Sequence, residues 1–312
     1  MASATKGARR RADNRLAWVQ DIVGYVEQYV DLPSVNLPTF DLPADPLLIA
    51  DEEIDAVADE LRRYWRLGEA PIANMVLLLE NHGFVVARGS LGAETLDGLS
   101  LYDGRRPFVF IGTDKGSAVR WRFDAAHELG HIVLHSHVSQ ERFQTTAINQ
   151  QIEHQAHRFA AAFLLPLAPF GDELFGVNLD VLRSLKPRWK TSIAMMIMRA
   201  KQGGFITDDA ERSLWIGMSR RKWRKSEPLD DVLEPEEPRL LRRSIEMILD
   251  AGEQTPADIC DYLALMPTDI EDLTGLDAGY LSSHSRVELS DTSSNVINLF
   301  KRDEDVPRLF DE

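Results

Sequence analysis

Apolar residues along the N-terminal half of the chain recur with helical periodicity, interrupted by one proline-rich segment. Residues 12–30 repeat Val and Ile at three- and four-residue steps, which indicates a single apolar helix face. Residues 32–43 contain three prolines and are typical of an extended linker. The pattern then predicts helices over about 51–65 and 71–83, the second ended by an Asn-His-Gly sequence.

Three short apolar runs follow, and turn residues between them predict strands. The predicted strands are residues 84–88, 98–102 and 107–111. Two helical patterns come next, at about 117–135 and 151–165, and Pro166 ends the second. The order of elements predicts an α+β fold, with a small antiparallel sheet packed on these two helices and further helical regions on either side.

Charge is distributed unevenly along the chain. The 35 Lys+Arg and 50 Asp+Glu give a net charge of −15, which argues against nucleic-acid binding over the whole surface. Residues 181–225 nevertheless carry 12 basic and 3 acidic residues (12 − 3 = +9), and residues 226–312 carry 7 and 22 (7 − 22 = −15). We expect the basic block 181–225 to be a solvated surface held by the acidic C-terminal part. Binding of nucleic acid or of an acidic partner is the alternative.

Cysteine content and hydropathy indicate the compartment. The single cysteine, Cys260, excludes an internal disulfide and fits a reducing environment. No apolar run is long enough to span a bilayer, and no apolar segment follows the basic N-terminus. We therefore expect a cytoplasmic protein without membrane contact.

Histidines concentrate in one region, because six of the eight fall within residues 127–157. An HExxH motif, from His127 to His131, lies at the start of this region. On a helix, positions i and i+4 share one face, so both imidazoles can bind one tetrahedral Zn²⁺. Glu128 lies about a third of a turn away, where its carboxylate can take a proton from a water molecule as general base. The motif predicts the catalytic zinc site of a hydrolase.

Catalytic zinc needs a third protein ligand, and the sequence leaves three possibilities. Glu153 lies on the next predicted helix with His157 one turn later, and this spacing favours Glu153 as the ligand and His157 as its hydrogen-bonding neighbour. His137 is an alternative, because it completes the ligand spacing HExxHxxxxxH, although Leu134 stands where that motif has a turning glycine. His157 itself is the other alternative. His135 is expected beside the ligands or facing solvent.

Small residues beside the predicted ligands indicate that the two helices meet. Gly130 costs about 1 kcal/mol of helix propensity relative to Ala, which is understandable if a second helix must approach it closely. Ala156 and residues 160–162, all alanines, make the 151–165 helix thin enough to do so.

At this point the chain resembles the ImmA/IrrE family of zinc metallopeptidases. The resemblance is carried by residues 120–135, RWRFDAAHELGHIVLH, and residues 153–166, EHQAHRFAAAFLLP. The second segment is similar to the approximate family pattern E-x-x-A-N/D-x-F-A-x-x-L-L-x-P, whose Glu is the third zinc ligand, with His157 where Asn or Asp is usual. Weaker similarity extends over most of residues 12–228.

This resemblance implies a zinc endopeptidase with a zincin-like domain. His127, His131 and Glu153 would bind Zn²⁺, and Glu128 would act as the general base. The implied substrate is a cognate helix-turn-helix repressor, whose cleavage relieves repression of mobile-element or stress-response genes. Longer relatives carry an N-terminal helix-turn-helix domain that residues 1–11 cannot form, so we expect a separately encoded repressor.

Two further expectations concern how a partner binds. The strand directly before the metal helix is expected to pair with an extended substrate. Its residues are Phe108, Val109, Phe110, Ile111 and Gly112. The alternative function is a non-catalytic regulatory protein that sequesters a repressor or toxin, and the complete HExxH with Glu153 argues against it. The oligomeric state is not specified by the sequence.

Linker signals divide the chain into six predicted segments. These are 1–43 (N-terminal helix and Pro-containing linker), 44–178 (zincin-like peptidase domain), 179–226 (small basic helical subdomain), 227–238 (acidic linker), 239–281 (C-terminal helical region) and 282–312 (disordered tail).

Overall fold

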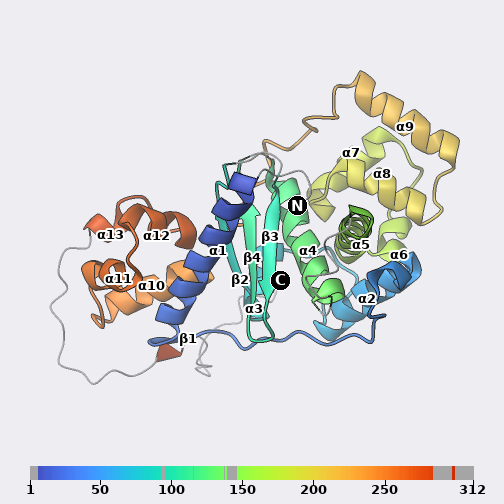
Figure 1. The fold of residues 1–312 in the computed structure, drawn as a ribbon. Helices are drawn as coiled ribbons and strands as arrows, with labels where there is room; N and C mark the ends of the chain where they lie inside the picture. The colour runs from blue at the N-terminus through green and yellow to red at the C-terminus, as the bar shows by residue number, and fades with distance from the viewer. Residues whose placement is uncertain are drawn as a thin grey trace, which may run out of the picture.

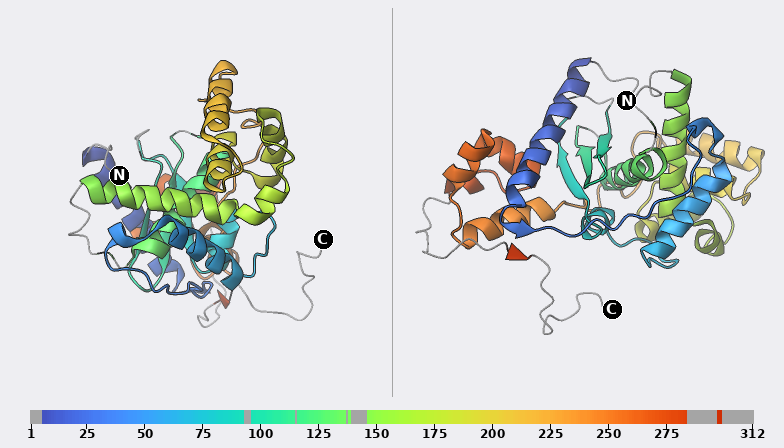
Figure 2. Two further views of the ribbon diagram at one scale, coloured as in Figure 1. Left: turned by 90° about the vertical axis from the view of Figure 1, so that its right-hand side faces the viewer. Right: turned by 60° about the horizontal axis from the view of Figure 1, so that its bottom comes forward.

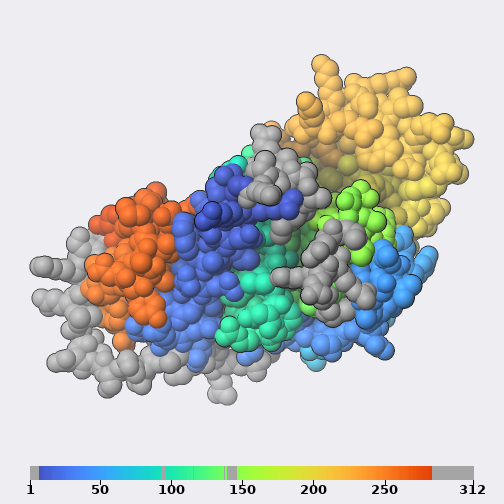
Figure 3. Space-filling view, in the orientation of Figure 1, coloured from blue at the N-terminus to red at the C-terminus, as the bar shows by residue number. Residues whose placement is uncertain are grey.

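A small β-sheet stands at the centre of the molecule with helices on both of its faces (Figure 1). The computed structural model describes residues 6–92, 96–114, 116–136, 138, 146–283 and 297–298. On one face of the sheet lie α4 (Ala118–His135) and α5 (Thr146–Leu164), and on the other lies α1 (Lys6–Val26). The helices of the C-terminal region pack beside α1 (Figure 3).

The remaining elements connect or flank this central arrangement. They are β1 (Val30–Asp31), η1 (Pro46–Leu48), α2 (Asp51–Tyr64), α3 (Met75–Asn81), α6 (Leu167–Asp172), α7 (Leu179–Trp189), α8 (Ile193–Gln202), α9 (Asp208–Arg220), α10 (Leu240–Asp250), α11 (Pro256–Leu263), α12 (Pro267–Thr274), α13 (Tyr280–Ser283) and β5 (Ile297–Asn298). Within the described residues, no helix has the length and apolarity needed to cross a membrane. The disordered tail expected over 282–312 falls almost entirely outside the described residues.

The sheet has the strand order β2-β4-β3, formed by β2 (Val85–Gly89), β3 (Gly98–Tyr102) and β4 (Pro107–Gly112). The α+β fold predicted from the sequence is confirmed, but the sheet is mixed. β3 pairs antiparallel with β4, as expected, whereas β2 pairs parallel with β4. The prediction of an antiparallel sheet was therefore wrong for β2. All six residues of β4 are buried, and a strand that is apolar on both faces gains most from the central position between its neighbours.

Alternation of side chains along the strands gives the sheet two cores. Val86 and Val109 face a core shared with α2, α3, α4 and α5. Their neighbours Val85 and Phe110 point the opposite way, into a core shared with α1 and the C-terminal helices. The sheet therefore joins the helices on either side of it in the sequence, α2 to α5, to helices from both ends of the chain.

The acidic segment 227–238, expected as a linker, is docked on the N-termini of helices. Glu227 accepts hydrogen bonds from the backbone N–H groups of Ile193 (2.7 Å) and Ala194 (2.9 Å), where α8 begins. It also pairs with the fully buried Lys186 of the basic block, at 2.9 Å. Carboxylates are stabilised at helix N-termini, because free N–H groups and the helix dipole both favour negative charge there.

A similar interaction links α3 to α10. The Glu80 carboxylate accepts hydrogen bonds from the backbone N–H groups of Arg239 and Leu240, each at 2.9 Å, and the residue is 4% exposed. Burial raises the pKa of Glu80 to about 7, and the two backbone hydrogen bonds offset only part of that effect. Stability should therefore depend on pH through this carboxyl group.

We expect wild-type protein to lose stability relative to Glu80→Gln as pH rises from about 4.5 to about 7. The folded pKa of about 7 exceeds the ordinary value of 4.5. In this interval the folded state therefore binds more protons than the unfolded state, and the free energy of unfolding falls with rising pH. A shift of this size corresponds to about 3 kcal/mol. Urea denaturation of both proteins at pH 4.5 and pH 8 measures the effect, and a wild-type-minus-variant difference independent of pH would contradict it.

Candidate metal centre

The HExxH residues lie in the second half of α4, at the point where α5 crosses it. A Cβ atom added to Gly130 would lie 3.1 Å from Phe159 Cδ1 and 3.2 Å from Ala156 Cα, both on α5. Only glycine allows the two helices to come this close, which confirms the close approach expected from the sequence. The right-hand view of Figure 2 shows α4 between the sheet and α5.

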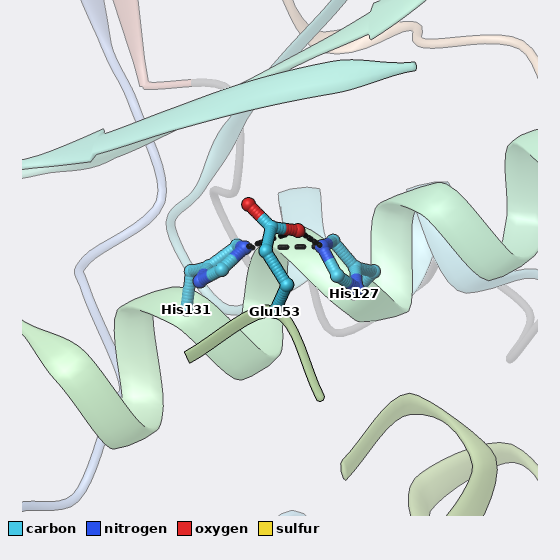
Figure 4. Close-up of side chains that lie close together, drawn as sticks. All are labelled: His127, His131 and Glu153. Carbon is cyan, nitrogen blue, oxygen red and sulfur yellow. Dashed lines mark hydrogen bonds and ion pairs between the residues drawn. The ribbon is translucent and has the colours of Figure 1, made fainter. Parts of the chain in front are cut away.

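Three candidate ligand atoms converge where the helices meet (Figure 4). His127 Nε2 and His131 Nε2 lie 3.0 Å apart, and Glu153 Oε2 lies 3.3 Å from the first and 3.8 Å from the second. Among the described residues, this is the group of His, Cys, Asp or Glu side chains that could hold a metal ion. Side-chain exposure is 10% for His127, 21% for His131 and 41% for Glu153, so the site is closed on one side and open on the other.

The chemistry and spacing of these atoms fit zinc. Two imidazoles and one carboxylate form a donor set of catalytic zinc sites, which keep an open fourth position. With ligand bonds of about 2.0–2.1 Å, tetrahedral geometry separates neighbouring ligand atoms by roughly 3.3 Å. The three separations of 3.0, 3.3 and 3.8 Å bracket that value.

Two further histidines hydrogen-bond the outer ring nitrogens of the candidate ligands. His127 Nδ1 lies 2.8 Å from His157 Nδ1, and His131 Nδ1 lies 3.3 Å from His135 Nδ1. The structure thus places His157 and His135 beside the histidine pair. His157 contacts His127, whereas the sequence predicted it as the neighbour of Glu153. His137, the rival third ligand, lies outside the described residues.

Glu128 faces the sheet. The residue is 6% exposed, and the Ser100 hydroxyl of β3 donates a hydrogen bond of 2.6 Å to its Oε2. Burial raises the pKa of Glu128 above its ordinary value, and the nearby His127 and the Ser100 hydrogen bond counteract this in part. A Cβ at Gly98 would lie 3.0 Å from Glu128 Oε1, so β3 approaches this carboxylate closely.

Charges at the site favour a cation. Burial raises the pKa of Glu153, but its interactions with the neighbouring His127 and His131 outweigh this effect and hold the pKa below its ordinary value. The carboxylate is therefore negative at neutral pH. Burial, reinforced by His127, lowers the pKa of His157 to about 4, so this imidazole is neutral at pH 7 and can accept a hydrogen bond.

Two residues of the site were not found from the sequence. Ser100 contacts Glu128 across 28 positions of the chain, and the fully buried Gln155 lies 2.9 Å from His135 Nε2 through its Oε1. Neither residue type signals chemistry by itself. The spacing of Gln155, two positions after Glu153, was the only available hint, and it did not distinguish a role at the site from an ordinary core position.

The prediction of the substrate-binding strand was wrong. Residues Phe108, Val109, Phe110, Ile111 and Gly112 belong to β4, whose two edges are already hydrogen-bonded to β2 and β3. A strand with both edges paired and all residues buried has no backbone groups left for a peptide. Within the described residues β3 is an edge strand of this sheet, and it is also the strand that contacts Glu128.

Comparisons with known proteins place the site in a recognised domain. Residues 79–201 match the family model Peptidase_M78, described as the IrrE N-terminal-like domain. No curated protein matches the chain. Among solved structures, a Mycobacterium tuberculosis transcriptional regulator matches at 18% identity with a TM-score of 0.37, covering 47% of this chain and 46% of that one. The chain thus spans less than half the length of that regulator.

Proposed function

We propose that this chain is a zinc-dependent endopeptidase, because its residues 79–201 match the peptidase family model described as the IrrE N-terminal-like domain. The supporting observation is the convergence of His127 Nε2, His131 Nε2 and Glu153 Oε2, with the Glu128 carboxylate beside them. The proposed substrate is a cognate helix-turn-helix repressor, whose cleavage would relieve repression of mobile-element or stress-response genes. This substrate follows from the family alone.

The proposed mechanism assigns the proton transfers to Glu128. When bound, Zn²⁺ would polarise the scissile carbonyl and make a water molecule at the open position more acidic. Glu128 accepts the proton of this water at its carboxylate and delivers it to the leaving amine. The Ser100 hydroxyl holds the carboxylate in place, and burial raises its pKa, which favours the protonated form that acts as the acid.

The free edge of β3 is the proposed docking strand for the substrate. It pairs with β4 on one side and with no described strand on the other, and Ser100 places it directly against Glu128. An extended peptide can add to such an edge through backbone hydrogen bonds. We therefore expect cleavage in an extended segment of the repressor, because a residue inside a helix has no backbone groups available for pairing.

Zinc binding is the first measurement. We expect purified protein to bind one equivalent of zinc, and His131→Ala and Glu153→Ala to weaken binding by more than the ~10–100-fold typical of losing a hydrogen bond to a ligand. His154→Ala is the matched control, since this neighbour of Glu153 is 55% exposed and faces Asp51 at 3.4 Å. Equal zinc affinity in the wild type and all three variants, measured by chelator competition, would contradict the proposed ligand set.

Incubation with a helix-turn-helix repressor tests the substrate, and a repressor encoded next to this gene, where one is found, is the first choice. Zinc-dependent cleavage, ended by chelation and restored by added zinc, is the expected result. A protein that binds both zinc and the repressor yet leaves the repressor intact would instead support sequestration without catalysis, and the endopeptidase proposal would then fail.

A further inference from the structure

Gln155 occupies a buried position behind the candidate metal ligands. It is 0% exposed and projects from α5. Its Nε2 lies 2.6 Å from the carbonyl oxygen of Pro46 and 3.2 Å from that of Ile49, and its Oε1 lies 2.9 Å from His135 Nε2. Both carbonyls belong to the short η1 segment and its C-terminal cap, more than 100 residues away in the chain.

These contacts fix the direction of the Gln155 amide. Carbonyl oxygens only accept hydrogen bonds, so the NH₂ group must face Pro46 and Ile49. The reversed amide would place its oxygen against two other oxygens in a site without solvent, where an unpaired polar group is costly. Oε1 therefore faces His135 and must accept a proton from its Nε2.

The same donor and acceptor argument applies to His135 and then to His131. A neutral imidazole that donates from Nε2 can only accept at Nδ1. His135 Nδ1 lies 3.3 Å from His131 Nδ1, so His131 must be the donor there. The proton of His131 then resides on Nδ1, and its Nε2 presents a bare lone pair toward Glu153 and His127.

We propose that Gln155 is a positioning residue that sets the tautomers of His135 and His131, so that His131 is ready to bind metal before metal arrives. The importance of this relay for zinc rests on the proposed function, whereas the tautomers are those that satisfy the contacts of Gln155, His135 and His131 with neutral rings. Metal-bound histidines commonly donate their other ring N–H to a fixed partner, which orients the ring and strengthens the ligand. Here the fixed partners are the backbone carbonyls of Pro46 and Ile49, which hold the Gln155 amide. The amide in turn orients His135, and His135 orients His131.

The histidine pair on the other side of the site lies further along the same series of contacts. His127 Nδ1 contacts His157 Nδ1 at 2.8 Å, and Gln155 has no hydrogen bond with either ring in the described structure. Among the described residues, Gln155 reaches His127 through His135 and the 3.0 Å contact between His131 Nε2 and His127 Nε2, so changing Gln155 should alter the protonation pattern of His135 and His131 more than that of His157.

The direct test is two-bond ¹H–¹⁵N correlation spectroscopy of histidine-labelled, metal-free protein. The wild type should carry its ring protons on Nε2 of His135 and on Nδ1 of His131, and Gln155→Leu should give mixed tautomers at both. A proton on His135 Nδ1, alone or together with one on Nε2, would overturn the proposal. This measurement on wild-type protein remains decisive if the variant fails to fold.

Zinc affinity separates a positioning role from simple packing. Gln155→Leu should bind zinc ~10–100-fold more weakly than wild type. Phe163→Leu, also a fully buried residue of α5, should lower the melting temperature without changing zinc affinity. Equal affinity losses in both variants would make Gln155 a structural residue. If wild-type protein binds no zinc, the proposed function fails, whereas the tautomer result stands or falls separately.

Discussion

Replacing Glu128 with Gln should slow repressor cleavage by about 10²–10⁴-fold, the range attributed to general acid–base catalysis, and should leave zinc bound. Gln has nearly the same size and can still accept the Ser100 hydrogen bond, but it cannot take up the proton of a water molecule. Metal content should be unchanged because Glu128 is not one of the three converging ligand residues. Initial cleavage rates at saturating zinc, with zinc content measured on the same samples, provide the result.

The control for this substitution is Glu60→Gln, which removes the same charge from an exposed position on α2. We expect its cleavage rate to equal that of the wild type. Equal rates for Glu128→Gln and wild type would refute the assigned base. Loss of zinc from Glu128→Gln alone would show that the carboxylate binds the metal, and the roles of Glu128 and Glu153 would have to be reassigned.

Local elements and the histidine pair were predictable because they depend on short-range geometry. The strands predicted at 98–102 and 107–111 lie at Gly98–Tyr102 and Pro107–Gly112, and the helix predicted at 117–135 lies at Ala118–His135. An i, i+4 spacing fixes the relative position of two side chains on one helix. The pairing of Gly130 with Ala156 was also predictable, because a glycine inside a helix costs stability unless a neighbouring element needs the space that a side chain would fill.

Contacts between distant residues were not predictable. Ser100 with Glu128, and Gln155 with the carbonyls of η1 and its cap, join segments whose proximity depends on the whole fold. The parallel pairing of β2 with β4 was not predictable for the same reason. The hydrophobic pattern indicates that β4 is buried on both faces, but it does not show which strands lie beside it. The substrate strand was expected at β4 because β4 directly precedes the metal helix, and proximity in the sequence did not show that β4 would be paired on both edges while β3 is an edge strand among the described residues.

Composition also concealed what individual acidic residues do. The segment 227–238 is rich in acid and proline, which is typical of a solvated linker. In the structure, the carboxylate oxygens of Glu236 accept a 2.6 Å hydrogen bond from the Met75 backbone N–H and pair with the Arg122 guanidinium. Arg122 lies on α4, the metal helix, and is 2% exposed. A count of charges over a segment cannot identify one carboxylate that neutralises a buried arginine.

Removing that carboxylate should be the most destabilising single change outside the metal site. Glu236→Ala leaves the Arg122 guanidinium buried without its counter-ion and Met75 N–H at the start of α3 without its acceptor. Breaking a buried ion pair by deleting one partner costs about 3–5 kcal/mol, measured as the free energy of unfolding in urea. Glu234→Ala is the matched control, since Glu234 is an exposed carboxylate of the same segment.

The pair of variants distinguishes a buried charge from lost packing. An exposed charge contributes about 0–1 kcal/mol, so Glu234→Ala should unfold near the wild-type midpoint. The double variant Arg122→Met with Glu236→Leu should recover most of the stability lost in Glu236→Ala, because replacing both ions with apolar side chains removes the unpaired charge. If the double variant is as unstable as the single one, the loss lies in the cap of α3 and not in the arginine. The acidic segment would then stabilise the metal helix only indirectly, through the helix that packs beside it.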